Sequence, residues 1–389
     1  MNRRAFLMTS LAAAPALCLK ARGAAAPQAQ IQRVWLSHRE GTPERLTISC
    51  QTAAPAAVAV KAGREGAEAT ARDEGGTLHH LDVPFVDDGS PFRYELTVEG
   101  QPPVRGVLRP SPKDVWRVAV VGDWGYAPAA NLAALRRDQS HLLVTVGDNV
   151  PCQHTLNGVG VKDGTRAYAA LIDSQPELFR STPFLPVLGN HDHEIRPRGA
   201  KPSAEPVYDV EATAFRSFFA LPAPGWHWRF DHPRFGARLL ALDLHHTSDF
   251  GTTWQTGHDF GPESEQLRWF DAQTAAGGAR HVVALQNERN ATMRSLKGWG
   301  PLFARCSAVL TGFGYFAERA EPAGGVPFFN TSLGGRGAKY ADSASKFLAG
   351  EDSYLLLSFK ERGPMKVELK SLDGRVLDTT EWPSRKETP

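Results

Sequence analysis

The sequence has almost no excess of charge of either sign. Its 389 residues include 44 Lys and Arg against 42 Asp and Glu, a formal net charge of +2 at pH 7. A nucleic-acid-binding surface or a polybasic membrane contact depends on clustered positive charge. The balance therefore argues against nucleic acid as a partner and favours a mixed, solvated surface.

Cysteine is also scarce. None of the four cysteines has the CxxC spacing of a thiolate zinc site, so such a site has no support. Loss of Cys18 with an N-terminal leader would leave Cys50, Cys152 and Cys306, an odd number in a compartment that permits disulfides. One disulfide plus a free thiol fits this count, and the pairing stays open. A Gly-x-Ser-x-Gly elbow is absent too, which argues against a serine hydrolase.

A long hydrophobic run is missing even at the N-terminus, where the apolar stretch is shorter than the roughly 20 residues that span a bilayer. Residues 1–26 begin with Arg3 and Arg4 close to the start, continue with apolar residues to Leu19 and end in three alanines. This pattern predicts a signal peptide of twin-arginine type, with an N-terminal membrane anchor as the less favoured alternative. We expect a periplasmic or secreted protein with no membrane span after cleavage.

The mature chain changes its pattern once, near residue 114. Residues 27–113 contain short alternating segments such as Phe92–Val98, separated by Gly and Pro, which predicts a small antiparallel β-sandwich. In residues 114–389, continuous apolar runs alternate with helical patterns, such as 129–139 and 168–179, and end abruptly in Gly, Asp or Asn. Near the C-terminus, Asp373-Gly374 predicts a hairpin turn between two further strands. Strands of this kind are buried on both faces, so we predict a layered α/β domain here.

Three of these predicted strands are followed by similar short motifs, each a Gly with Asp or Asn directly after it. The segments are Gly122-Asp123-Trp124-Gly125, Gly147-Asp148-Asn149 and Gly189-Asn190-His191-Asp192. Because ligands of such sheets bind at the carboxyl ends of the strands, we expect these side chains to converge. Two carboxylates, an amide and an imidazole suit a divalent metal.

With these motifs in this order, the sequence resembles the calcineurin-like metallophosphoesterase superfamily, and within it the purple acid phosphatase branch. The resemblance implies a layered β-sandwich flanked by helices, preceded by a fibronectin-like sandwich domain. It also implies two metal ions that share a bridging Asp, activate a water and neutralise the phosphoester. On this resemblance Asp123 binds the first metal, Asp148 bridges, Asn190 binds the second, and His191 contacts the phosphate as an acid or charge stabiliser.

The second half of the pattern departs from that family. Gln286-Asn287 stands where the resemblance implies a ligand His and commonly a second one. Gly312-Phe313-Gly314-Tyr315 stands where it implies Gly-x-x-x with two ligand His. Zinc and iron favour imidazole and need about four good ligands. A full Fe or Zn dinuclear centre is therefore not expected.

Other donors could replace the missing imidazoles. An oxygen-rich remnant of Asp123, Asp148, Asn190 and, tentatively, Gln286 would favour one hard cation such as Mg²⁺, Ca²⁺ or Mn²⁺. Several further side chains follow strand ends or lie in nearby loops and remain open as ligands: Cys152, His154, His193, His245, His246, Asn287 and Glu288.

Two functions follow from this site. The favoured hypothesis is an exported protein on a metallophosphoesterase fold that holds a phosphoester or other anionic ligand but has attenuated or lost hydrolysis. The alternative is an active, acid phosphatase-like phosphoesterase with a mononuclear or otherwise non-standard site. A third interpretation, surface or carbohydrate binding through the N-terminal sandwich, rests only on the order of the domains. Fold alone does not decide between them, because function belongs to the site.

Overall fold

The computed structural model describes residues 29–86, 89–108, 114–323, 325–335, 337 and 339–384. The predicted signal peptide, residues 1–26, lies outside the described residues, and so does the proline-containing segment at the predicted domain boundary, 109–113. That boundary stays a prediction. Within the described part of the chain, no helix has both the length and the apolar character needed to cross a bilayer.

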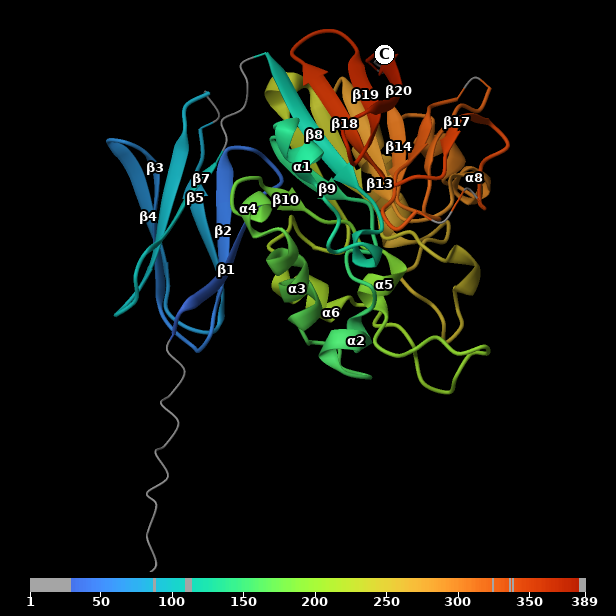
Figure 1. The fold of residues 1–389 in the computed structure, drawn as a ribbon. Coiled ribbons are helices and arrows are strands. Elements are labelled where there is room, and N and C mark those ends of the chain that lie inside the picture. The colour runs from blue at the N-terminus through green and yellow to red at the C-terminus, as the bar shows by residue number, and fades with distance from the viewer. Residues whose placement is uncertain are drawn as a thin grey trace, which may run out of the picture.

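Two antiparallel sheets form the N-terminal part, at the left of Figure 1. Strand β6 buries every second side chain, so the alternation in its sequence places one face on the core and the other toward solvent. The core between the sheets consists of small and aliphatic side chains with Phe92 and Tyr94. One sheet has the order β1-β2-β5, with strands Ile31–Ser37, Arg45–Thr52 and Leu78–Pro84. The other has the order β4-β3-β6-β7, with strands Ala67–Asp73, Val58–Arg64, Phe92–Val98 and Val104–Leu108.

The larger part of the chain contains two more sheets, stacked face to face. The six-stranded sheet has the order β10-β9-β8-β18-β19-β20, with strands Phe184–Leu185, Leu142–Thr145, Val115–Val121, Ser353–Lys360, Met365–Ser371 and Val376–Trp382. The seven-stranded sheet has the order β11-β12-β13-β14-β16-β15-β17, with strands Trp228–His232, Ala237–Ala241, His281–Gln286, Ala308–Thr311, Phe328–Asn330, Ala317–Ala320 and Ser345–Ala349. The strands that end at the three polar motifs are parallel, as predicted.

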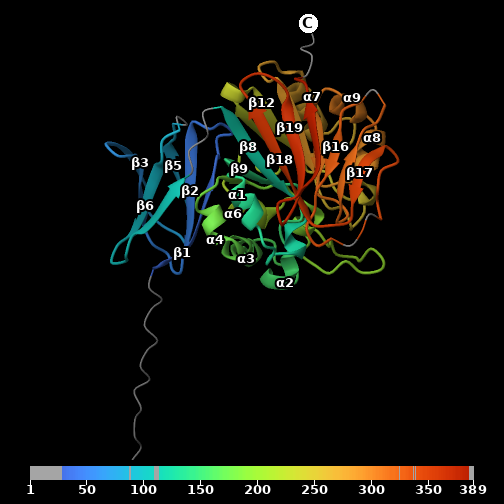
Figure 2. The ribbon, with the colours of Figure 1, turned by 45° about the horizontal axis from the view of Figure 1, so that its top comes forward.

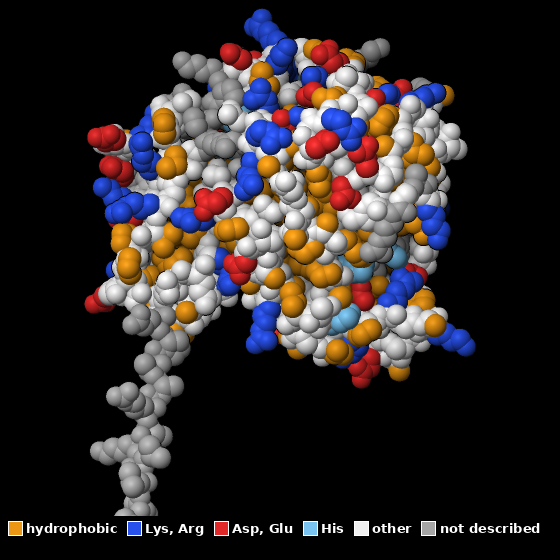
Figure 3. Space-filling view, in the orientation of Figure 1, with side chains coloured by type: hydrophobic (Ala, Val, Ile, Leu, Met, Phe, Trp, Pro, Cys, Tyr) orange, Lys and Arg blue, Asp and Glu red, His pale blue; other side chains and the backbone are white. Residues whose placement is uncertain are grey.

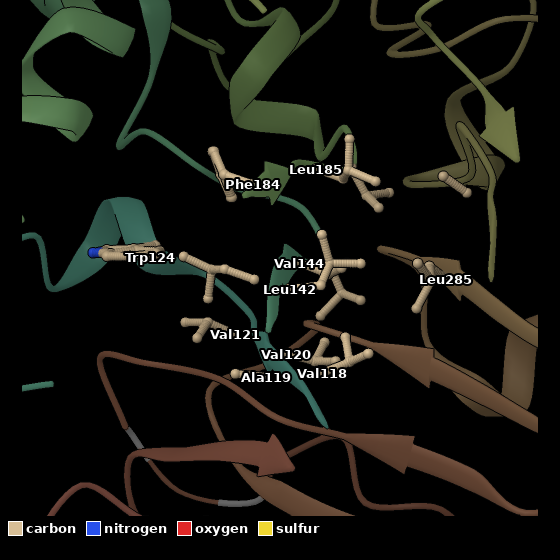
Figure 4. Packing of buried hydrophobic residues seen from close by; sticks show 14 of the residues in the cluster. Val118, Ala119, Val120, Val121, Trp124, Leu142, Val144, Phe184, Leu185 and Leu285 are labelled. Carbon is tan, nitrogen blue, oxygen red and sulfur yellow. The ribbon is translucent and has the colours of Figure 1, made fainter. Parts of the chain in front are cut away.

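Side chains from both sheets fill the space between them. Val118, Val144 and Leu285 come from β8, β9 and β13 and belong to one continuous core, part of which Figure 4 shows. On the other face of the seven-stranded sheet, Leu240 and Leu242 pack against helices α7, α8 and α9. The central strands β12, β13 and β14 are buried on both faces, so they are mostly apolar. The predicted fold class, an α/β domain of stacked sheets flanked by helices behind an all-β domain, is confirmed.

The helices are short and lie outside the two sheets, as Figures 1 and 2 show. Some were predicted too long: the pattern from residue 129 to 139 forms only α1, and the pattern from 168 to 179 is divided between two helices at Pro176. Proline fits the first turn of a helix but breaks its interior. The helices are α1 Ala133–Arg137, α2 Gln153–Asn157, α3 Arg166–Ser174, α4 Pro176–Phe179, α5 Asn190–His193, α6 Thr213–Phe218, α7 Glu265–Ala275, α8 Asn290–Ser295 and α9 Gly300–Phe303.

The two parts of the chain are joined by apolar contacts. Trp35 of β1 stacks on Phe218 of α6 with ring centroids 4.5 Å apart and an interplanar angle of 8°. Trp35 therefore belongs to the core of the larger part and not to that of its own sandwich. Arg33 of the same strand forms an ion pair with Asp173 of α3 at 2.9 Å. The N-terminal sandwich is thus packed firmly against the helices α3 and α6.

Candidate metal centre

The two aspartates of the motifs sit directly after parallel strands in an unusual backbone conformation. Asp123 follows β8 and Asp148 follows β9, and each has φ of 52°. A left-handed conformation is uncommon for residues other than glycine and is found where a turn must aim a side chain into a site. Gly122 allows a second loop to pass, because a Cβ there would lie 2.5 Å from the Cα atom of Gly312. The loop that carries Phe313 and Tyr315 is therefore held beside the first motif.

The four predicted site residues line one cavity of about 480 Å³. Asp123, Asp148, Asn190 and His191 share it with Phe313 and Tyr315. Asp123 and Asp148 are both buried. Burial, followed by the charge of Asp148, raises the pKa of Asp123 well above its usual range. Two buried carboxylates in one cavity are costly as anions, and a bound cation would offset that cost.

His191 is held in the cavity by groups on three sides. Its Nδ1 lies 3.1 Å from Glu194 Oε2, its Nε2 lies 3.9 Å from Asp148 Oδ2, and the Tyr126 hydroxyl bonds to the same Nε2. Burial works against the charged imidazole, but Asp148 and hydrogen bonds with Cys152 and Glu194 outweigh it and raise its pKa to about 11. In this arrangement His191 carries a positive charge at neutral pH.

Aromatic rings lie in and beside the cavity, next to the motifs. The rings of Tyr126 and Tyr315 meet edge to face at 4.9 Å, and Phe313 meets Tyr340 in the same way at 5.4 Å. Tyr126 also packs edge to face on His191 at 5.1 Å. In the neighbourhood of α2 and α5, Figure 3 shows histidine side chains at the surface beside acidic and basic ones. The cavity thus combines carboxylates, imidazoles and aromatic rings.

A family model now accounts for this arrangement. Residues 117–314, which contain all three strand-end motifs and the Phe313 loop, match the family model described as calcineurin-like phosphoesterase. The chain belongs to this family. No match was found among curated proteins.

Solved structures agree with the family at the level of the fold. The chain is similar to a purple acid phosphatase from yellow lupin (Lupinus luteus) seeds, with a TM-score of 0.70 and 13% identity over 92% of this chain and 75% of that one. It is also similar to PhoD, with a TM-score of 0.60 and 12% identity over 90% of this chain and 88% of that one. At identities this low, the similarity shows the fold alone, and it includes the all-β part ahead of the phosphoesterase domain.

Gln286, a tentative ligand, does not line this cavity. Its Nε2 donates to the Glu288 carbonyl at 3.1 Å, and its Oε1 accepts from the Glu288 backbone N–H. Both polar ends are used within their own loop. We therefore leave Gln286 out of the proposed ligand set.

The neighbouring Asn287 does not line the cavity either, but its side chain is close enough to Asp123 to lower the pKa of that carboxyl. Its Nδ2 donates to the Val146 carbonyl at 2.7 Å and to the Gly312 carbonyl at 3.3 Å. Its buried Oδ1 has no hydrogen-bond partner within the described residues. A buried oxygen without a partner is costly, and a cation bound by the two aspartates would satisfy it. The position of Asn287 just after β13 could be predicted from the sequence, but the orientation of its side chain could not.

The four candidate replacement histidines divide into two pairs. His154 and His246 line the cavity, and both already have polar partners. His154 Nε2 lies 3.4 Å from Glu194 Oε1, and His246 Nδ1 lies 3.0 Å from Arg198 Nη1. His193 and His245 do not line it. They are fully buried against Asp243 in a separate group.

A hydrogen-bond network fixes the third motif from behind. Asp192 accepts from the Gly189 N–H at 2.9 Å, from the Asn149 N–H at 3.2 Å and from Asn149 Nδ2 at 2.9 Å. Thr145 in turn donates to Asn149 Oδ1 at 2.5 Å. The second and third motifs therefore form one rigid unit.

None of the three cysteines in the described part of the chain takes part in a disulfide. Cys50 lies in the core of the N-terminal sandwich and Cys306 in the core under α7 to α9, while Cys152 precedes α2 near the cavity. The disulfide that the sequence left open is not formed between these residues in this structure.

Proposed function

We propose that the cleft of this calcineurin-like phosphoesterase holds one hard divalent cation, Mg²⁺, Ca²⁺ or Mn²⁺, and binds a phosphoester or related anion while hydrolysing it poorly or not at all. Asp123, Asp148 and Asn190 would supply the ligands, and Asn287 Oδ1 a further oxygen. Hard cations prefer such oxygen donors. Within the family, the domain order and fold favour the purple acid phosphatase branch.

The observation that carries this proposal is the position of Phe313 and Tyr315 in the cavity beside Asp123 and Asp148. The family resemblance puts ligand imidazoles at these two residues. Phe313 offers no lone pair and Tyr315 offers only its phenol oxygen, so the nitrogen donors that zinc or iron favour are missing there. A complete Fe or Zn dinuclear centre is therefore outside the proposal.

Binding of an anion is supported by the positive groups around the cavity. His191 is held in its charged form, and Arg198 lines the cavity with its guanidinium 4.2 Å above the ring of Trp254. A cation between the aspartates would neutralise the Asp148 charge that raises the pKa of His191, and would itself attract the anion. The loss of each well-placed electrostatic group typically costs about two to three orders of magnitude in rate. Binding without efficient turnover follows.

Calorimetric titration of the purified chain with Mg²⁺, Ca²⁺ and Mn²⁺ tests the proposed cation. We expect one equivalent per chain, and none in Asp123→Asn/Asp148→Asn, because Asn tolerates the positive φ but removes the charge. The matched control is Asp163→Asn, a change at an exposed aspartate. Two equivalents, or no binding at millimolar concentration, would contradict the proposal. Inorganic phosphate should bind more tightly once the cation is present.

An active phosphoesterase with a non-standard site is the second candidate, and the charged His191 next to Asp148 favours it. An imidazolium in that place can donate a proton to a leaving group. Turnover of a phosphomonoester or phosphodiester that requires Asp148 would establish this candidate.

The location of the protein is a separate proposal. We propose export to the periplasm or beyond through a twin-arginine signal in residues 1–26, supported by the Arg3-Arg4 pair and the apolar stretch behind it. The N-terminal residue of the exported protein should lie near residue 27. Retention of Met1 in the mature chain would rule out cleavage.

A further inference from the structure

A second group of potential ligands lies behind the cleft, outside the site already described. His193 closes helix α5, and Asp243 and His245 follow strand β12. Their side chains are completely buried. His193 Nε2 lies 3.2 Å and His245 Nε2 lies 2.7 Å from the same oxygen, Asp243 Oδ1. One ligand atom from each of the three residues lies within 4.8 Å of the others.

The outer nitrogens of both rings are already committed as donors. His193 Nδ1 lies 2.7 Å from the Asp209 carbonyl, which can only accept. His245 Nδ1 lies 2.8 Å from Thr256 Oγ1, whose own proton goes to the His245 carbonyl at 2.8 Å. Each ring therefore carries its proton on Nδ1.

This commitment leaves two bare Nε2 atoms in the neutral rings, both facing a carboxylate oxygen. Lone pairs that converge in a buried space repel unless protons or a cation lie between them. A donated outer N–H and an inward lone pair are the arrangement of metal-binding histidines in proteins.

The carboxylate is oriented as a metal ligand would be. Its other oxygen, Asp243 Oδ2, accepts from the His258 N–H at 2.9 Å and lies 2.7 Å from His258 Nδ1. The His258 ring is fixed by stacking on Trp226 with centroids 3.8 Å apart. Gly257 makes room, since a Cβ there would lie 2.8 Å from Asp243 Oδ2. The remaining oxygen, Asp243 Oδ1, faces the Nε2 atoms of His193 and His245.

We propose that His193, Asp243 and His245 bind one transition-metal cation of the zinc type, with His258 holding the carboxylate from outside. Two imidazoles and one carboxylate suit Zn²⁺ or Co²⁺ far better than Mg²⁺ or Ca²⁺. The ion would connect α5, which carries Asn190 and His191, to the end of β12. Its role is to position the cleft and stabilise the domain, whether or not the cleft itself holds a cation.

The test uses the full chain with the cleft disabled by Asp123→Asn/Asp148→Asn, so that its outcome does not depend on the proposed function. After Zn²⁺ loading and gel filtration in excess Mg²⁺, elemental analysis should find one zinc per chain. Adding His245→Gln should remove it. Adding His281→Gln, which changes a buried imidazole outside the group, should leave it in place. Adding His258→Gln should weaken zinc binding about 10- to 100-fold, as expected for a group behind a ligand.

A zinc content near zero in the cleft-disabled protein, or one that His245→Gln leaves unchanged, would overturn the proposal. If His245→Gln does not fold, the visible absorption of the Co²⁺-loaded, cleft-disabled protein decides. An intense ligand-field band of a four-coordinate ion supports the site, and the weak spectrum of hydrated Co²⁺ refutes it.

Discussion

Phe313 and Tyr315 lie in the cleft with two buried aspartates, and neither side chain carries the imidazole nitrogen that the family resemblance places there. Tyr315 has φ of 62°, so its backbone needs the left-handed region. Histidine is among the residues that adopt that region more readily than most. The ligand pattern of the family could therefore be restored at both residues without new backbone strain.

We predict that Phe313→His/Tyr315→His gains Zn²⁺ or Mn²⁺ affinity by at least about tenfold and phosphomonoester turnover by about 100-fold, since each restored group contributes on that scale. Calorimetry and steady-state kinetics measure the two effects. The control Phe313→Leu/Tyr315→Phe changes the same rings without adding nitrogen. Equal zinc affinity in a folded double-histidine variant and in this control would show that these residues do not face the metal.

At the scale of single residues, the sequence predicted the motif residues well and their partners poorly. Asp123, Asp148, Asn190 and His191 could be predicted because parallel strands bring their carboxyl ends to one edge. The failure of Gln286 to reach the cavity depends on hydrogen bonds within one loop. The pairing of Tyr126 with Tyr315, and of His193 with Asp243, joins residues far apart in the chain, and no local pattern contains that information.

Helix α5 shows how an element of only four residues can be held rigid. Isolated helices of this length are unstable. Asp192 fixes this one by accepting three N–H groups from the second and third motifs while it lies buried. Its position sets the orientation of Asn190 and His191 on the same turn.

We predict that Asp192→Asn destabilises the fold by about 1 to 3 kcal/mol, because one acceptor oxygen becomes an amide N–H₂ within a buried group of hydrogen-bond donors. The free energy of unfolding from urea denaturation measures the effect. Asp163→Asn, at an exposed position, should change it by less than about 0.5 kcal/mol. Similar stabilities for the two variants would mean that the network does not hold the helix.

The elements themselves were predictable to different degrees. Continuous apolar runs correctly predicted the buried parallel strands, and Asp373-Gly374 correctly predicted the hairpin between β19 and β20. Helix lengths were overestimated because apolar spacing alone does not show where capping ends a helix. Strand order in the seven-stranded sheet, where β16 lies between β14 and β15, required the tertiary structure.

At the scale of the whole molecule, the N-terminal sandwich and the phosphoesterase domain share an interface that contains a partly buried histidine. His80 of β5 lies 2.8 Å from Ser49 Oγ through its Nδ1 and has its ring 6.2 Å from that of Trp35. Burial, and then Arg39, lowers the pKa of His80 to about 4. The folded molecule therefore favours the neutral ring.

This shift predicts acid sensitivity of the interface. Because the pKa of His80 is lower in the folded state than its usual 6.5, its contribution is fully present above pH 6.5 and is lost as the pH falls toward 4. The loss amounts to roughly 3 kcal/mol at most. We expect urea denaturation between pH 7 and 4 to show a smaller decrease in the free energy of unfolding for His80→Gln than for the wild type. Parallel curves for the two proteins would contradict this account.

The central claim is that the cleft binds a cation and an anion but no longer catalyses hydrolysis efficiently. The most direct test is steady-state hydrolysis of a phosphomonoester and a phosphodiester by the full chain, with Mg²⁺, Mn²⁺, Fe²⁺ or Zn²⁺ added, beside Asp148→Asn. The account predicts equal, near-background rates for the two proteins with every metal. Metal-dependent turnover by the wild type that disappears in Asp148→Asn would contradict it.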